Sequence, residues 1–475
     1  MNKRFDLSYL LIVPWLLRVS SPWFQYRTKA IVAIPLFLLW CLFQIAKPSR
    51  FNLRFWFNVR RMYFIFCAAI VVFFGLLPLL AGGIDLSSIG RGALSRRTIV
   101  QMLTLLAFAF IVYWSLVKHK FKELRFLGVI VLLSFLQMGI VTLLFGDIVS
   151  DGASRIMVAI GNGELDSGSV DASLAESAQI IGTYGLGNYD FAYLAAFLTP
   201  AFLFSSLKIP SKLLKTLCLL SALGATVVVY KGGLQTPVFV LILGLFLFIL
   251  ALLFKLQKSL VALGCLAMLG IGLFIVQPKV YIFLSPVLRA ASEMTEDPNY
   301  KLHLDTLAEA AEGDKLTYAY KRYRLQVRSW EGFCEHPFLG GGPNARSGGH
   351  SELLDTMSAY GLTGLFCMVF LLTRFYKFNA ALGYAVLGKQ WLVMVSAYIG
   401  LFIFTSITNP VDMLSPVAIL LFPALALSYP GAPLGGSVGK EERKSHEIRG
   451  IDDVPQPGGD DAGVSGAPLR RGEGV

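Results

Sequence analysis

Charged residues are scarce in this chain, and their scarcity excludes most soluble folds. Asp, Glu, Lys and Arg make up 15% of the 475 residues, whereas hydrophobic residues make up 55%. The mean hydropathy is +0.63, and a soluble protein of this length could not bury that much apolar surface. We therefore expect a polytopic membrane protein. Its net charge of +12 comes mostly from basic residues in short loops between apolar runs, which indicates membrane topology rather than a nucleic-acid site. An anionic substrate or lipid headgroup is a further alternative.

Several chemical signatures are missing as well. Among the six cysteines only Cys334 lies in a polar loop, and no Cys-x-x-Cys pair occurs, so the pattern predicts neither a disulfide framework nor a zinc site. No cluster of carboxylates and histidines resembles a metal site, and no Gly-x-Ser-x-Gly elbow or phosphate-binding loop is present. The apolar runs hold almost no charge, which weakens an ion-coupled transporter. We expect no metal and no cofactor.

Twelve apolar runs dominate the chain. Most approach the ~20 residues that cross a bilayer, and backbone groups in lipid must pair within a helix. The runs fall at about 7–24, 30–46, 62–82, 99–117, 126–146, 190–207, 213–230, 233–254, 259–277, 353–373, 391–407 and 413–428. No cleavage site follows the first run, so a retained helix is expected there. The predicted fold class is all-α, with residues 1–432 forming one membrane domain of about twelve helices.

Basic residues in the short loops predict the orientation. If the N-terminus lies inside, the inside segments hold 19 lysines and arginines and the short outside segments hold 8. Positively charged loops stay in the cytoplasm, so both termini are predicted to be cytoplasmic. Two long loops, 147–189 and 278–352, then lie outside, and short helices are expected within 306–328. Residues 433–475, rich in Gly, Pro and charge, are predicted to form a disordered cytoplasmic tail.

The stretch from Arg324 to Gly364 carries the candidate chemistry. His350 stands just before an apolar helix, where the positive end of the helix dipole favours a neutral imidazole able to act as a base. The simpler reading is a capping or interface histidine. Gly361 and Gly364 are spaced for close helix packing, which would fix the helix that carries His350.

Three basic residues face the same predicted side. Arg324 and Arg328 share a helix face and could grip phosphate oxygens, although a solvated basic face is the simpler reading. Lys231, in a short outside turn, either faces a polar cavity or extends to the headgroups. The turn that contains Gly340 and Gly342 needs glycine backbone freedom and could cradle an anion.

These residues resemble a known family. His350-Ser351-x9-Gly361-x-x-Gly364 is similar to the motif of bacterial O-antigen ligases and related glycan polymerases. The arginine-rich segment, His336-Pro337 and the glycines at 340–342 look like that superfamily's preceding block, and the segment 182–188 looks like its upstream one. The resemblance covers roughly residues 60–430.

The resemblance implies metal-independent glycosyl transfer at the periplasmic face of the bacterial inner membrane. The donor would be a glycan on undecaprenyl pyrophosphate, and the acceptor another glycan, a lipid-linked glycan or a protein hydroxyl. His350 would be the base on the acceptor hydroxyl, and Arg324, with Arg328 as the alternate, would bind the leaving pyrophosphate. Lys231 stands where the family often has an arginine. The candidate substrate-binding residues are Lys231, Asn188, Asn344 and Arg346.

Two readings compete at this stage. A polymerase, slightly favoured, or a ligase would transfer glycans, with a flippase and a chain-length regulator as further partners. The alternative is a polytopic glycolipid transporter or flippase, which predicts cations along a path through the spans, and few are present. An assembly scaffold is a third, weaker possibility.

Overall fold

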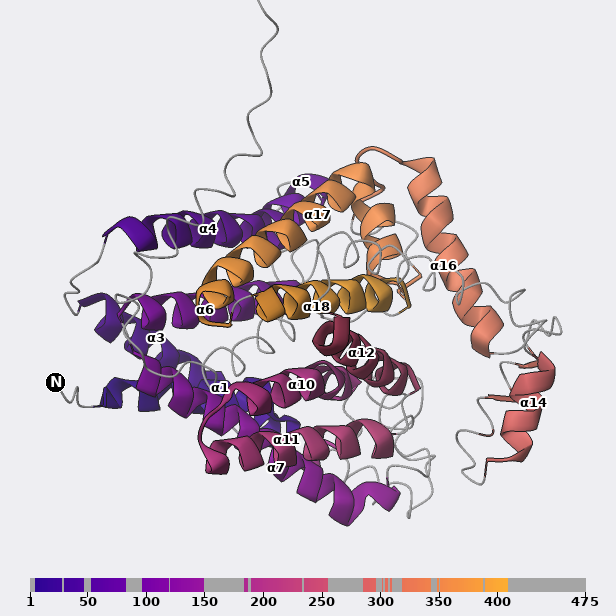
Figure 1. Cartoon of the computed structure of the whole chain (residues 1–475). Helices are drawn as coiled ribbons and strands as arrows, with labels where there is room; N and C mark the ends of the chain where they lie inside the picture. Colours follow the sequence, from indigo (N-terminus) through magenta and orange to yellow (C-terminus); the bar gives the residue numbers. More distant parts are fainter. Residues whose placement is uncertain are drawn as a thin grey trace, which may run out of the picture. The chain divides into compact units, whose positions relative to one another are not determined.

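The computed structural model describes residues 5–27, 30–46, 53–82, 96–118, 120–148, 183–186, 189–232, 235–254, 285–295, 301, 304–305, 308–309, 318–342, 348–349, 351–387 and 389–408. Every regular element in these ranges is a helix (Figure 1). The predicted runs 259–277 and 413–428 and the predicted tail 433–475 lie outside them. The all-helical fold class is confirmed, whereas the number of twelve spans stays a prediction.

The first half of the chain alternates short and long helices. Its elements are η1 (Leu7–Ile12), α1 (Val13–Ser20), α2 (Pro22–Arg27), α3 (Ala30–Ala46), α4 (Leu53–Val71), the π-helical η2 (Val72–Leu76), α5 (Leu77–Gly82), α6 (Arg96–Val117) and α7 (Phe121–Ile148). The run predicted as one helix from residue 7 is therefore in three pieces. Its last break comes at Ser21, whose backbone is extended, just before Pro22.

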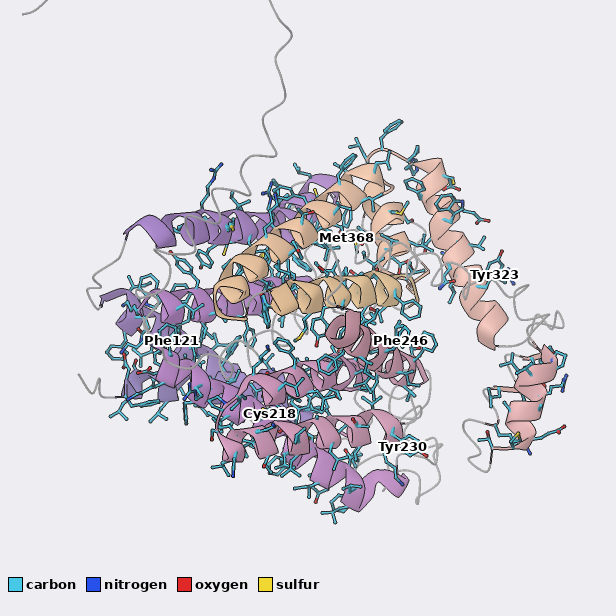
Figure 2. The ribbon with its side chains drawn as sticks, in the orientation of Figure 1. Phe121, Cys218, Tyr230, Phe246, Tyr323 and Met368 are labelled. Carbon is cyan, nitrogen blue, oxygen red and sulfur yellow. The ribbon has the colours of Figure 1, made fainter. Side chains whose placement is uncertain are left out.

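The second half carries the candidate residues. Its elements are α10 (Tyr189–Lys208), α11 (Lys212–Lys231), α12 (Gln235–Phe254), α14 (Ser285–Glu293), α16 (Tyr318–Glu335), α17 (Glu352–Leu387) and α18 (Lys389–Thr408). The helix expected within the second long loop is α16, which packs against α17. Figure 2 marks α16 by Tyr323 and α17 by Met368.

Six helices within the described residues are long and apolar enough to cross a membrane. They are Arg60–Ala81, Ile99–Leu116, Phe121–Phe145, Asp190–Lys208, Lys212–Lys231 and Glu352–Asn379. Shorter apolar helices occupy Leu7–Ser20, Ile31–Ala46, Thr236–Ile249 and Met394–Ile407. These lengths and compositions fit a multi-pass membrane protein.

Side-chain contacts fix the relative directions of four helices. Ser221 Oγ donates to the Leu132 carbonyl at 2.9 Å, and further along both helices a Cβ on Gly139 would lie 2.4 Å from Gly224 Cα. Helices α7 and α11 therefore run parallel, with no room for a side chain where they meet. Phe204, near the end of α10, packs against Trp391, near the start of α18, at 6.4 Å between ring centroids. Phe197, earlier in α10, packs against Tyr398, later in α18, at 6.3 Å. Helices α10 and α18 therefore run antiparallel.

These directions bring the lysine-rich turns to one end of the helices. The turns before α7 and before α11, and the start of α18, share that end. Its basic residues are Lys118, Lys120, Lys122, Lys208, Lys212, Lys215 and Lys389. The grouping agrees with the loop charges that the sequence analysis placed inside. The opposite end holds Lys231 and the last turn of α18.

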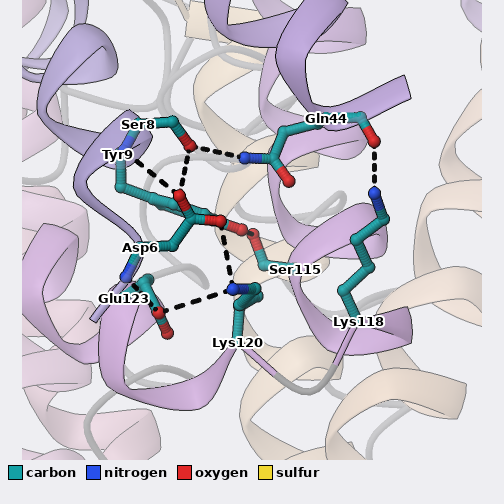
Figure 3. Close-up of polar contacts among 8 residues, drawn as sticks. All are labelled: Asp6, Ser8, Tyr9, Gln44, Ser115, Lys118, Lys120 and Glu123. Carbon is teal, nitrogen blue, oxygen red and sulfur yellow. Dashed lines mark hydrogen bonds and ion pairs between the residues drawn. The ribbon is translucent and has the colours of Figure 1, made fainter. Parts of the chain in front are cut away.

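A polar cluster joins the N-terminal segment to the lysine-rich end (Figure 3). Lys120 Nζ lies 3.0 Å from Asp6 Oδ2 and 3.8 Å from Glu123 Oε1, and Glu123 accepts from the Asp6 backbone N–H at 2.9 Å. Asp6 also caps η1 by accepting from the Ser8 backbone N–H. Tyr9 and Ser115 share a buried hydrogen bond of 2.7 Å. The N-terminal segment is thus fastened to α6 and α7 by groups from distant parts of the chain.

We expect Asp6→Ala to lower the free energy of unfolding of the protein by roughly 1–2 kcal/mol, because it removes both a helix cap and an ion pair. Thermal unfolding of the purified protein in detergent would show a lower midpoint. Lys122→Ala, at an exposed position on the same turn, is the matched control and should leave the midpoint unchanged. An unchanged midpoint in Asp6→Ala would contradict the claim that this cluster stabilises the N-terminal segment on α6 and α7.

Candidate functional site

The glycine turn after α16 lies directly on α17. The Gly340 N–H donates to the His336 carbonyl at 3.0 Å and closes the turn. The Gly341 and Gly342 N–H groups then donate to the Ser358 and Ala359 carbonyls, each at 3.0 Å. The turn and the helix are thus joined by backbone hydrogen bonds, which place the end of α16 firmly against α17.

Gly361 breaks α17 at this contact. Its φ of 61° and ψ of −153° belong to a region that only glycine adopts readily. The freed Leu362 and Thr363 N–H groups donate to the Pro337 and Phe338 carbonyls at 2.8 and 3.2 Å. The helix therefore consists of two pieces, residues 352–360 and residues 362–387. Carbonyl groups just before the glycines of the turn accept the hydrogen bonds that the break leaves free.

The continuous helix expected over 353–373 is thus corrected by the structure. A Cβ on Gly361 would lie 2.5 Å from the Phe338 carbonyl carbon, and one on Gly340 would lie 2.2 Å from the Ala359 carbonyl oxygen. Gly364 is close-packed too, with its added Cβ 2.6 Å from Tyr360 Cβ. Glycine is required here because the backbones of the glycine turn and of α17 touch at a kink, rather than because two long helices pack together.

A second set of contacts holds the chain just before α17. Ser329 Oγ, on the buried side of α16, donates to Asp355 Oδ1 at 2.6 Å and accepts from the Gly348 N–H at 2.8 Å. Asp355 also accepts from the backbone N–H groups of Gly349, at 3.3 Å, and Ser351, at 3.2 Å. One carboxylate therefore fixes the backbone on both sides of position 350.

Ser351 continues this network into α18. Its buried hydroxyl donates to the Ser406 carbonyl at 3.1 Å and accepts from the Leu354 N–H at 3.2 Å, so it caps the first turn of α17. From α16, Gln326 Nε2 donates to the Ile407 carbonyl at 3.4 Å. Three helices, α16, α17 and α18, therefore meet at the end opposite to the lysine-rich turns.

The two candidate arginines lie on α16 beside this network. Arg324 and Arg328 are exposed, and each immediately precedes a residue that contacts the segment before α17. A Cβ on Gly348 would lie 2.0 Å from the Leu325 carbonyl oxygen, and Gly348 donates to Ser329. In the described residues no hydrogen bond or ion pair engages either guanidinium group. The structure thus brings both arginine positions next to the backbone that flanks position 350.

The other candidates are placed differently. Lys231 ends α11, a helix that packs against α7, α10 and α12. Gly185, in the upstream segment of the resemblance, has a φ of 70°, and a Cβ added there would lie 2.4 Å from Pro22 Cβ. The predicted site residues His350, Asn188, Asn344 and Arg346 lie outside the described residues. Within the part of the chain that the structure describes, no group of three His, Cys, Asp or Glu side chains could hold a metal ion.

Sequence reasoning missed Asp355 and Ser329. A single carboxylate in an apolar run forms no metal-site pattern, and a serine inside a basic helix gives no signal of its own. One pattern could have found Asp355: it follows Ser351 by four residues at a helix start, where acidic side chains often accept free N–H groups. Comparison of the chain with protein families, with curated proteins and with solved structures finds no match.

Proposed function

We propose that the chain is a membrane-embedded glycosyltransferase that polymerises or ligates glycans carried on undecaprenyl pyrophosphate, with polymerase slightly favoured. The observation that carries the proposal is the network around Asp355. It fixes the backbone on both sides of position 350 next to the turn of α16 that holds Arg324 and Arg328. A base and phosphate-binding cations must be close together for such a reaction, and this arrangement supports that.

In this proposal each residue has a separate task. His350 removes the proton from the acceptor hydroxyl as that oxygen attacks the sugar carbon. The bond from that carbon to the pyrophosphate oxygen breaks, and the diphosphate leaves with the charge. Arg324, or Arg328 as the alternate, stabilises that charge by paired hydrogen bonds. Both guanidinium groups are exposed at their positions, which suits a ligand that arrives from outside the helices.

The lysine-rich turns support the expected side. They gather at one end of the helices, and the Asp355 network lies at the other. If the basic end faces the cytoplasm, the network faces the periplasm, where lipid-linked repeats are polymerised in the proposed reaction. The inner membrane as the location and the outward direction of the site are parts of the same proposal.

The test is His350→Ala in the native host. We expect loss of long glycan chains at an unchanged protein level, and lipid-linked repeats should accumulate on the outer side of the membrane. Glu331→Ala, whose side chain is exposed on α16, is the control and should keep normal chains. Normal chains in His350→Ala would refute the proposal. Repeats that accumulate on the cytoplasmic side would favour the flippase reading instead.

A further inference from the structure

The tip of the glycine turn carries two large apolar side chains that nothing in the described residues covers. Phe338 is 73% exposed and Leu339 is 75% exposed. Their backbone is nevertheless fixed, because the Phe338 carbonyl accepts from the Thr363 hydroxyl at 2.6 Å and from the Thr363 N–H at 3.2 Å. A rigid backbone therefore presents two apolar side chains outward, an arrangement that needs a partner.

The exposed side of α17 continues directly from this tip. Thr363 is itself exposed, and it shares a helix face with Phe366 and Phe370, three and seven residues further on. Phe366 is 73% exposed and Phe370 is 41% exposed. They lie in a stretch of α17 that is long and apolar enough to cross a membrane. Along the helix axis Thr363 precedes Phe366 by only about 4.5 Å, so the tip stands where this apolar face begins.

Trp330 adds a third side chain of the kind found at membrane surfaces. It lies in the last turns of α16, is 49% exposed, and packs against Phe333 at 5.3 Å between ring centroids. Tryptophan is enriched at headgroup level because its ring is apolar and its N–H is polar. The neighbouring side chains of Glu331 and Glu335 are exposed. The end of α16 therefore exposes both an aromatic side chain, Trp330, and two carboxylates.

We propose that Trp330, Phe338 and Leu339 form an interfacial anchor that inserts into the boundary between headgroups and acyl chains of a phospholipid bilayer. A lipid surface is favoured over a second protein copy because the tip continues the apolar face of α17. The Pro337 and Phe338 carbonyls already have donors in α17, so insertion would not strand these polar groups. The anchor depends on α17 crossing the membrane and not on the reaction that the chain catalyses.

The direct test measures the depth of the tip in a membrane. Leu339→Cys would be made in the full chain with the native cysteines replaced by serine, labelled with the environment-sensitive dye NBD, and reconstituted into vesicles of phosphatidylethanolamine and phosphatidylglycerol. We expect a blue-shifted emission, and stronger quenching by lipids with a spin label near the headgroup than by lipids labelled deep in the acyl chain. The same dye on Glu331→Cys is the matched control and should emit as in water.

Two results would overturn the anchor. One is a water-like emission at position 339 that no spin-labelled lipid quenches. The other is a blue shift that lipid labels leave unchanged but that dilution with unlabelled protein removes, which would assign the tip to contact between copies. If the cysteine-free chain fails to fold, the emission difference between the native chain and Trp330→Phe gives a second readout. That difference should be quenched by brominated lipids, and an unquenched difference would refute insertion of Trp330.

Discussion

Gly361→Ala is expected to destabilise the protein by about 3 kcal/mol or more. Two costs combine: alanine is strained at a φ of 61° and ψ of −153°, and its Cβ would lie 2.5 Å from the Phe338 carbonyl carbon. The Phe338 carbon belongs to the backbone, so relief requires the glycine turn to separate from α17. Thermal unfolding in detergent should show a clearly lower midpoint, and the proposed glycosyltransferase activity should be lost with it.

Gly349→Ala separates the two costs. Gly349 also has a positive φ, 70°, but nothing lies within 4 Å of a Cβ added there. Only backbone strain is then expected, roughly 1–2 kcal/mol. Equal losses of stability in the two variants would contradict the close contact at Gly361. A third variant, Gly340→Ala, disrupts the same contact from the glycine turn. The loss of stability in the double variant Gly340→Ala/Gly361→Ala should therefore be smaller than the sum of the two single losses.

If the chain has the proposed glycosyltransferase activity, Asp355→Ala is expected to reduce glycan synthesis about 100-fold, because a displacement of about 1 Å at a reacting group has an effect of that size. The substitution removes the acceptor for Ser329 Oγ and for the Gly349 and Ser351 N–H groups. Unsatisfied donors also lower the stability, by roughly 2–4 kcal/mol. Chain length distributions on gels and thermal unfolding would measure the two effects separately.

Three control variants distinguish a displaced position 350 from a general loss of folded protein. Asp355→Asn keeps one acceptor oxygen, so stability and activity should fall between those of the native protein and Asp355→Ala. Ser329→Ala removes one hydroxyl from the same network and should cost about 1 kcal/mol. Glu331→Gln changes an exposed acid on α16 and should have no effect. Normal glycan chains in Asp355→Ala at full protein level would show that position 350 does not depend on this carboxylate.

The helical fold could be predicted from hydrophobicity, but its breaks could not. The run predicted at 126–146 corresponds to α7, Phe121–Ile148, which is longer because a helix extends past its apolar part with polar residues at its ends. The run at 62–82 is likewise part of a longer helical stretch that contains the π-helical segment Val72–Leu76. Hydropathy averages over a window of residues, so it carries no information on a local change of hydrogen-bond pattern.

The candidate site stays a prediction, and the contacts that surround it could not be read from the sequence. The spacing of Gly361 and Gly364 indicates a close backbone contact in this segment, yet the kink at Gly361 depends on the glycine turn more than twenty residues earlier in the sequence. The contact of Ser329 with Asp355 spans 26 residues. Such pairings arise only when α16 packs against α17, and a single sequence does not show which distant residues come together. The role of His350 stays a prediction, since it lies outside the described residues.

The bond from Ser351 to Ser406 also has a consequence for biosynthesis. A nascent chain emerges from the ribosome in order, so residue 351 must wait for 55 further residues before its acceptor exists. Gln326 waits for Ile407 in the same way. The meeting point of α16, α17 and α18 can therefore form only after the last turn of α18 has been made. A chain that stops short of residue 406 would therefore lack the contact that holds the start of α17 against α18.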